Sequence, residues 1–101
     1  MFCYEKKRNG LFVRLTGELD HSAADGMRRE LDRLIDETGA RRLVFDMGEL
    51  EFMDSSGIGL IIGRYKKMTR RGGVVAVRGA KGKIDQIFRM AGLYQLVERL
   101  A

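Results

Sequence analysis

The sequence has no proline, no tryptophan and one cysteine among its 101 residues. The lone Cys3 excludes an internal disulfide and fits a reducing compartment. The longest apolar stretch, residues 58–63, is too short to cross a bilayer. Four charged residues at positions 5–8 interrupt the N-terminus before a signal-peptide core could form. With no low-complexity tract either, we expect a single cytoplasmic domain over residues 1–101, with no membrane partner.

Charge of both signs is plentiful, with 19 lysines and arginines against 14 aspartates and glutamates and a net charge of +5. The basic residues come as scattered pairs, and no aromatic residues alternate with them as a stacking platform for bases requires. This pattern argues against nucleic acid as a direct partner. It favours a solvated basic face suited to an acidic protein.

Strand-like segments alternate with helix-like segments along the chain. Residues 2–7 and 11–16 indicate a hairpin, because Asn9-Gly10 between them is a strong two-residue turn signal. Residues 17–20 are then expected to leave the second strand as a short loop. Two nearly continuous apolar runs are typical of strands buried on both faces, and a last short strand is expected near the C-terminus. These three segments are residues 42–46, 74–77 and 93–97.

Three amphipathic segments are expected to be helices. In the first, apolar residues recur up to Thr38, with Ser22 as N-cap, Asp25 in a variant capping box and Gly39 as the stop. The second covers residues 58–71 and is expected to expose Arg64 with four other basic residues. The third covers residues 84–91. The order predicts an α/β fold, a mostly parallel sheet of about four or five strands with an N-terminal hairpin and about three or four packed helices.

The most informative segment is Phe52-Met53-Asp54-Ser55-Ser56-Gly57-Ile58-Gly59. Two hydroxyls lie where a loop enters a helix, beside backbone N–H groups without helical partners and at the positive end of the helix dipole. A serine there is either a plain cap or a site that carries phosphate. Asp54 is likewise either a brace for the loop or a base for the hydroxyl, and Ser56 helps the helix to start.

Catalytic and cofactor-binding patterns are incomplete. The glycines from Gly57 to Gly63 differ from a dinucleotide fingerprint, because the third comes one residue late and no acidic residue follows at the usual distance. A nucleophile elbow needs Gly-x-Ser-x-Gly, and residue 53 is Met. The only histidine, His21, would be the sole base for Ser55, and it has no cysteine with which to share a metal. We therefore expect no enzymatic activity, no cofactor and no metal.

Several segments together resemble the STAS domain family, and within it the anti-sigma factor antagonists. The likeness covers essentially the whole chain. It rests on Leu15-Thr16-Gly17-Glu18-Leu19-Asp20, the strand ending near Asp46, the Asp-Ser-Ser-Gly motif, Gly72-Gly73 and Met90-Ala91-Gly92-Leu93. The sporulation members are the most similar. The alternatives are a general-stress antagonist or a scaffold subunit of a signalling assembly.

The resemblance implies a regulatory switch. Such antagonists bind an anti-sigma factor that is also a serine kinase and so release the sigma factor, here expected to be the sporulation factor sigma F. The kinase phosphorylates the serine directly after the aspartate, which is Ser55, and a serine phosphatase reverses this. We expect a monomer whose docking residues surround Ser55. They are Glu18, Asp20, His21, Asp54, Ser56, Gly57 and Ile58, although His21 also fits a plain polar residue at a helix entry.

A phosphate on Ser55 has a physical rationale at this place. It brings about −1.5 to −2 charges and three acceptor oxygens. We expect the N–H groups of Gly57 and Ile58 to hold these oxygens without remodelling the fold. The phosphate would then act locally, by repelling acidic groups or by blocking contact. Gly57 and Gly59 have no Cβ, which allows close approach of a partner or of the sheet.

Overall fold

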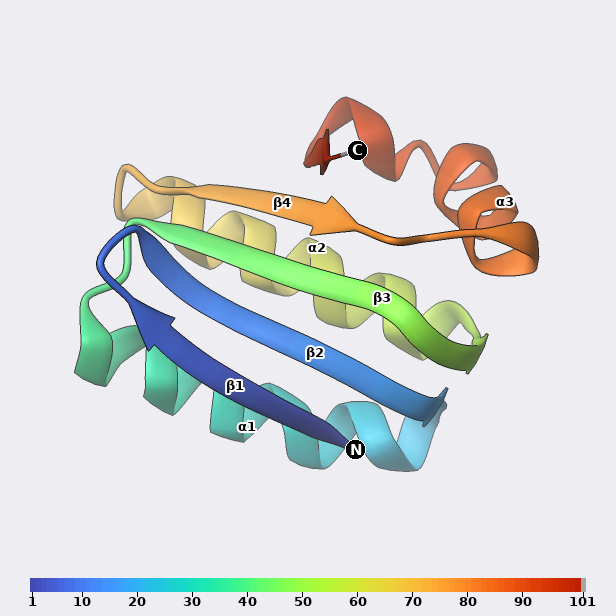
Figure 1. Cartoon of the computed structure of the whole chain (residues 1–101), viewed down its shortest axis with the longest axis horizontal. Coiled ribbons are helices and arrows are strands. Elements are labelled where there is room, and N and C mark those ends of the chain that lie inside the picture. The colour runs from blue at the N-terminus through green and yellow to red at the C-terminus, as the bar shows by residue number, and fades with distance from the viewer. Residues whose placement is uncertain (101) are drawn as a thin grey trace.

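The computed structural model describes residues 1–100, and Figure 1 shows their arrangement. A five-stranded sheet has the order β1-β2-β3-β4-β5, with β1 antiparallel to β2 and the remaining pairs parallel. The expected α/β fold, with its hairpin and mostly parallel sheet, is confirmed. The elements are β1 (Phe2–Lys7), β2 (Gly10–Leu19), α1 (His21–Thr38), β3 (Arg42–Met53), α2 (Ser55–Arg70), β4 (Val74–Arg78), α3 (Gly82–Met90), the 3-10 helix η1 (Leu93–Gln95) and β5 (Glu98–Leu100).

Helices α1 and α2 lie beside each other behind the sheet in Figure 1. The crossovers from β2 to β3 and from β3 to β4 run in the same direction, and right-handed crossovers of that kind place both helices on one face. The core lies between this face and the helices. It includes alternate residues of β2 and the inner stripes of both helices: Leu11, Val13, Leu15, Leu31, Ile35, Ile61 and Met68.

Strand β2 is longer than the sequence suggested. Residues 17–19 were expected in a loop, but they continue the strand up to the pairing of Leu19 with Met53. Gly17 has a φ of 77°, and the register between β2 and β3 shifts on both sides of it. The glycine therefore supports a bulge that bends the strand without ending it. Strand β3 extends correspondingly beyond Asp46.

The start of α1 and the hairpin turn both differ by one or two residues from their predicted positions. Helix α1 begins at His21, and its N-cap is Asp20 rather than Ser22, which lies within the first turn. The hairpin turn is Arg8-Asn9, because Gly10 already pairs with Lys7 in the sheet. A Cβ at Gly10 would come within 2.4 Å of the Arg42 carbonyl oxygen. Gly10 therefore lies in the strand, where its lack of a Cβ lets the backbone of Arg42 pack closely against it.

Two further predictions fail for packing reasons. Arg64 was expected on the exposed side of α2, but α1 packs there and Arg64 is buried. Its Nε lies 3.0 Å from Oδ1 of Asp32 on α1. Residues 93–97 were expected to form a strand. They instead form η1 and a turn, with Leu93 and Val97 buried, and β5 starts only at Glu98. No helix within residues 1–100 is long and apolar enough to span a membrane.

Candidate functional site

Helices α1 and α2 begin side by side, at the carboxyl ends of β2 and β3 (Figure 1). Leu19 pairs with Met53 in the parallel register, so the next residues, Asp20 and Asp54, hold equivalent positions. Oδ1 of Asp20 accepts the Ala23 N–H at 2.9 Å, and Oδ1 of Asp54 accepts the Ser56 N–H at 2.9 Å. Each aspartate caps its helix. The structure thus gives Asp54 the bracing role that the sequence left open.

The two serines of the motif have different surroundings. Ser55 is the first residue of α2, and its side chain is exposed. Ser56 is half-buried, and its Oγ lies 3.4 Å from Nδ1 of His21, the first residue of α1. This contact joins the first turns of the two helices. Ser55 is therefore accessible to solvent, whereas Ser56 takes part in the contact between helices.

The backbone donors that were expected to hold a phosphate are already engaged. The N–H groups of Gly57 and Ile58 both donate to the Asp54 carbonyl oxygen, at 3.0 and 3.3 Å. The expectation that these two groups hold a phosphate is wrong for this helix start. The reason is that α2 begins at Ser55 rather than at Ile58, so the carbonyl oxygen of its N-cap residue, Asp54, is already in place to accept both N–H groups. The Ser55 side chain itself is exposed to solvent at the start of the helix.

The two glycines of the motif differ in what surrounds them. Gly57 is buried against the strand ends, and a Cβ there would lie 2.3 Å from Cγ of Met53 and 3.0 Å from Cδ2 of Leu19. Gly59 is exposed, and a Cβ there would meet no atom within 4 Å. Gly57 thus lets α2 approach the sheet. Gly59 has no side chain to fill the hollow of about 250 Å³ that lies between the starts of α1 and α2. His21, Arg28 and Ser56 also line this hollow.

The edge that carries Ser55 is acidic. Four carboxylates at the ends of β2 and β3 form no ion pair with any residue of the described chain. They are Glu18, Asp20, Glu51 and Asp54. Carboxylates left unpaired on a surface favour a partner with basic side chains.

The sequence interpretation missed Glu51 and also an apolar side chain of this edge, Phe52. Phe52 is 46% exposed and lies opposite Glu18 in the register. Because neighbouring strand residues face opposite ways and Met53 is buried, Phe52 must point outward. Alternation along β3 could have revealed it. Together with the half-buried Ile58, Phe52 supplies apolar surface of the kind that anchors protein interfaces.

All predicted site residues meet at this one edge, where β2 and β3 end and α1 and α2 begin. The exposed members are Glu18, His21 and Ser55, and the half-buried ones are Asp20, Asp54, Ser56 and Ile58. Gly57 is the exception, because it is buried and can affect a partner only through the backbone that it positions. The arrangement offers an accessible hydroxyl within a mixed acidic and apolar surface.

Comparison with known proteins agrees with this geometry. The STAS domain model matches residues 3–101. The anti-sigma F factor antagonist of Paenibacillus polymyxa is 39% identical over 93 residues, covering 92% of this chain and 80% of that protein. The anti-sigma factor antagonist SpoIIAA in its unphosphorylated form has a TM-score of 0.81 at 25% identity, covering 100% of this chain and 88% of that one. The phosphorylated form of Bacillus SpoIIAA has a TM-score of 0.79 at 27% identity, covering 100% and 92%. The chain belongs to the STAS domain family, among the anti-sigma factor antagonists.

Proposed function

We propose that this chain is a phosphorylation-controlled switch that acts on an anti-sigma factor with serine kinase activity. The unphosphorylated form binds that kinase through the edge around Ser55 and releases the sigma factor, sigma F. Phosphorylation of Ser55 ends the interaction, and a serine phosphatase restores it. The chain itself is the substrate in this cycle rather than an enzyme.

The exposed hydroxyl of Ser55 is the observation that carries the proposal. It lies at the first position of α2, next to a cap that fixes the local backbone, and no side chain of the described residues forms a hydrogen bond with it. A kinase can reach it without opening the core. The similarity to SpoIIAA, a protein whose phosphorylated and unphosphorylated forms have both been solved, adds support.

The local electrostatics explain how a phosphate would act without unfolding the domain. The N–H groups of Ser56, Gly57 and Ile58 are committed to Asp54, so these three donors would not neutralise the phosphate charge. It would add about −1.5 to −2 charges to an edge that already carries unpaired carboxylates. It would also occupy the space over the first turn. The phosphate would then block a partner's contact with Ile58 and Phe52, and this steric effect does not require the partner to be acidic.

Phosphorylation and binding can be tested together with purified proteins. The chain is incubated with the anti-sigma F factor and ATP, and intact mass and peptide mapping then locate any phosphate. We expect one phosphate on Ser55 in wild type and in Ser56→Ala, and none in Ser55→Ala. Calorimetry should show that Ser55→Ala binds about as tightly as wild type. Ser55→Asp should bind at least about tenfold more weakly, a loss of about 1.4 kcal/mol.

Two results would contradict the proposal. One is a phosphate that maps to Ser56 or to another residue while Ser55 stays unmodified. The other is equal affinity of Ser55→Ala and Ser55→Asp for the anti-sigma factor. A parallel titration with an anti-sigma B factor decides between the sporulation and general-stress systems, and we expect the tighter complex with the anti-sigma F factor.

A further inference from the structure

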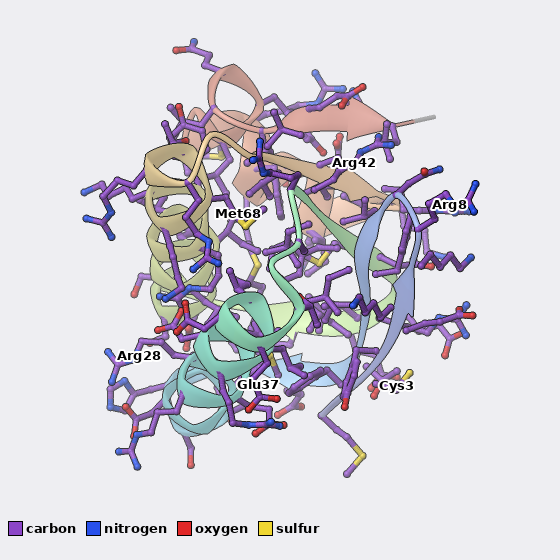
Figure 2. All side chains as sticks on the ribbon, turned by 90° about the vertical axis from the view of Figure 1, so that its left-hand side faces the viewer. Cys3, Arg8, Arg28, Glu37, Arg42 and Met68 are labelled. Carbon is purple, nitrogen blue, oxygen red and sulfur yellow. The ribbon has the colours of Figure 1, made fainter. Side chains whose placement is uncertain are left out.

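Three turns meet at the end of the molecule opposite Ser55, the end that faces the viewer in Figure 2. They are the β1–β2 turn, the α1–β3 connection and the α2–β4 connection. The Val74 N–H donates to the Arg41 carbonyl oxygen at 3.0 Å, and Gly10 and Gly73 let the backbone at residues 41–42 approach closely. The first two turns enclose a hollow of about 150 Å³. Segments distant in sequence thus form one continuous surface.

This surface is rich in basic side chains, each turn supplying at least one that is exposed and forms no ion pair with a described residue. These residues are Lys6 and Arg8 from the β1–β2 hairpin, Arg41 from the α1–β3 connection and Arg70 from the end of α2. We call these four residues the basic end. Three of them, Lys6, Arg8 and Arg41, line the hollow.

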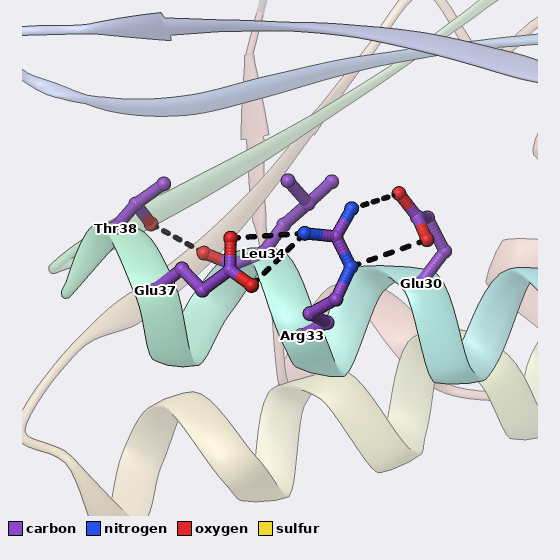
Figure 3. A network of polar contacts seen from close by, with 5 residues as sticks. All are labelled: Glu30, Arg33, Leu34, Glu37 and Thr38. Atoms are coloured by element: carbon purple, nitrogen blue, oxygen red, sulfur yellow. Dashed lines mark hydrogen bonds and ion pairs between the residues drawn. The ribbon is translucent and has the colours of Figure 1, made fainter.

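Nearby carboxylates are committed to other cations. Glu37 forms an ion pair with Arg33, which Glu30 also contacts, and the two carboxylates raise the pKa of Arg33 (Figure 3). Oδ1 of Asp36 forms ion pairs with Nζ of Lys67 at 3.1 Å and with Nη1 of Arg71 at 2.6 Å. The ion pairs inside the chain therefore leave the charge of the basic end unneutralised.

We propose that the basic end is a second docking surface, which binds a carboxylate-rich surface of another protein. It lies one length of α2 away from Ser55, about 22 Å at a rise of about 1.5 Å per residue. A phosphate at Ser55 would be nearly three Debye lengths away at physiological salt, where that length is about 8 Å, so the basic end stays available in both phosphorylation states. This surface adds to the proposed function and does not depend on it.

The surroundings of the basic end favour a protein over nucleic acid. No aromatic side chain lines the hollow, so bases have nothing to stack on. Carboxylates lie among the cations, with Glu5 paired to Lys7 and Glu98 paired to Arg42. A continuous phosphate backbone would be repelled by them, whereas a protein surface can pair with both signs of charge.

The proposal can be tested on the full chain by amide NMR titration with an oligoglutamate peptide at low salt. Saturable shift changes are expected for residues 6–8, 40–42 and 70–73, and not for residues 18–21 or 54–58. The variant Arg8→Glu/Arg41→Glu/Arg70→Glu should bind the peptide at least about tenfold more weakly. The matched control Arg78→Glu/Lys81→Glu/Lys83→Glu changes the net charge equally at exposed positions of the β4–α3 region, and it should stay within about threefold of wild type.

Three outcomes would overturn the proposal. The first is equal weakening in the two triple variants, which would mean that only net charge matters. The second is tighter binding of a short random-sequence DNA duplex than of the peptide at the same residues, which would assign the surface to nucleic acid. The third is the absence of saturable shifts at the basic end of the wild-type chain. Because this last readout needs no variant, the test holds even if a triple variant fails to fold.

Discussion

Gly57 lies so close to Met53 that a Cβ added to the glycine would come within 2.3 Å of the methionine Cγ. The same added Cβ would lie 3.0 Å from Cδ2 of Leu19 on the neighbouring strand. Gly57→Ala should therefore destabilise the domain by about 1–3 kcal/mol, because the start of α2 must shift or Met53 must leave its rotamer. Urea denaturation monitored by circular dichroism measures this change.

Gly59 is the matched position two residues along the same helix. It is exposed, and a Cβ there meets nothing within 4 Å, so Gly59→Ala should stabilise the domain by about 0.5–1 kcal/mol. If a partner uses the low helix surface, the same variant binds the anti-sigma factor more weakly although its fold is more stable. A stabilised variant with unchanged affinity would show that Gly59 lies outside the interface.

Two substitutions of Asp54 distinguish the contribution of its capping hydrogen bond to stability from the contribution of its charge. Asp54→Ala removes the acceptor of the Ser56 N–H and should cost about 1 kcal/mol of stability. Asp54→Asn keeps an acceptor oxygen and should stay near wild type in denaturation experiments. Asp20→Ala, the equivalent change in α1, is the control and should cost about the same. If Asp54→Asn and Asp54→Ala destabilise equally, the capping interpretation fails.

Local patterns in the sequence predicted most of this fold, and two of the failures depend on contacts between distant segments. Strand alternation and helical periodicity depend on near neighbours, so the hairpin, the parallel order and Asp54 at the start of α2 were accessible. The burial of Arg64 depends on α1 packing across α2, which no local pattern encodes. The continuation of β2 past Gly17 likewise depends on pairing with β3. At the site, the loss of Gly57 and Ile58 as phosphate donors followed from a helix start three residues earlier than expected.

The ion pair between the buried Arg64 and the half-buried Asp32 predicts an unequal response to mutation. Burial and the nearby Arg28 lower the pKa of Arg64, and Asp32 opposes this shift. Asp32→Ala leaves a buried guanidinium without its counterion and should lower the free energy of unfolding by about 2–3 kcal/mol. This is less than the loss expected for a fully buried ion pair, because the Asp32 side chain is 35% exposed. Arg64→Met should stay within about 1 kcal/mol of wild type, since water can reach the remaining carboxylate. Urea denaturation decides, and a larger loss in Arg64→Met would contradict this reasoning.

Stability at high pH should depend on the contact between Tyr94 and Asp85. The Tyr94 hydroxyl donates to Oδ1 of Asp85 at 2.6 Å, which joins η1 to α3. Burial and this hydrogen bond raise the pKa of Tyr94 to about 12. An unfolded tyrosine titrates near pH 10, so the folded state favours the neutral phenol. The resulting stabilisation is complete below about pH 10 and declines as the pH rises toward about 12.

Tyr94→Phe removes the hydroxyl and serves as the reference. The Tm of wild type should exceed that of Tyr94→Phe from neutral pH to about pH 9.5, and the difference should shrink above about pH 10. Tyr4 and Tyr65 are present in both proteins, so their contributions cancel in the difference. Absorbance of the phenolate gives an independent check, because the signal of the Tyr94 phenol at about pH 12 should be absent from Tyr94→Phe. A Tm difference that stays constant up to about pH 12 would show that the hydrogen bond does not stabilise the neutral phenol.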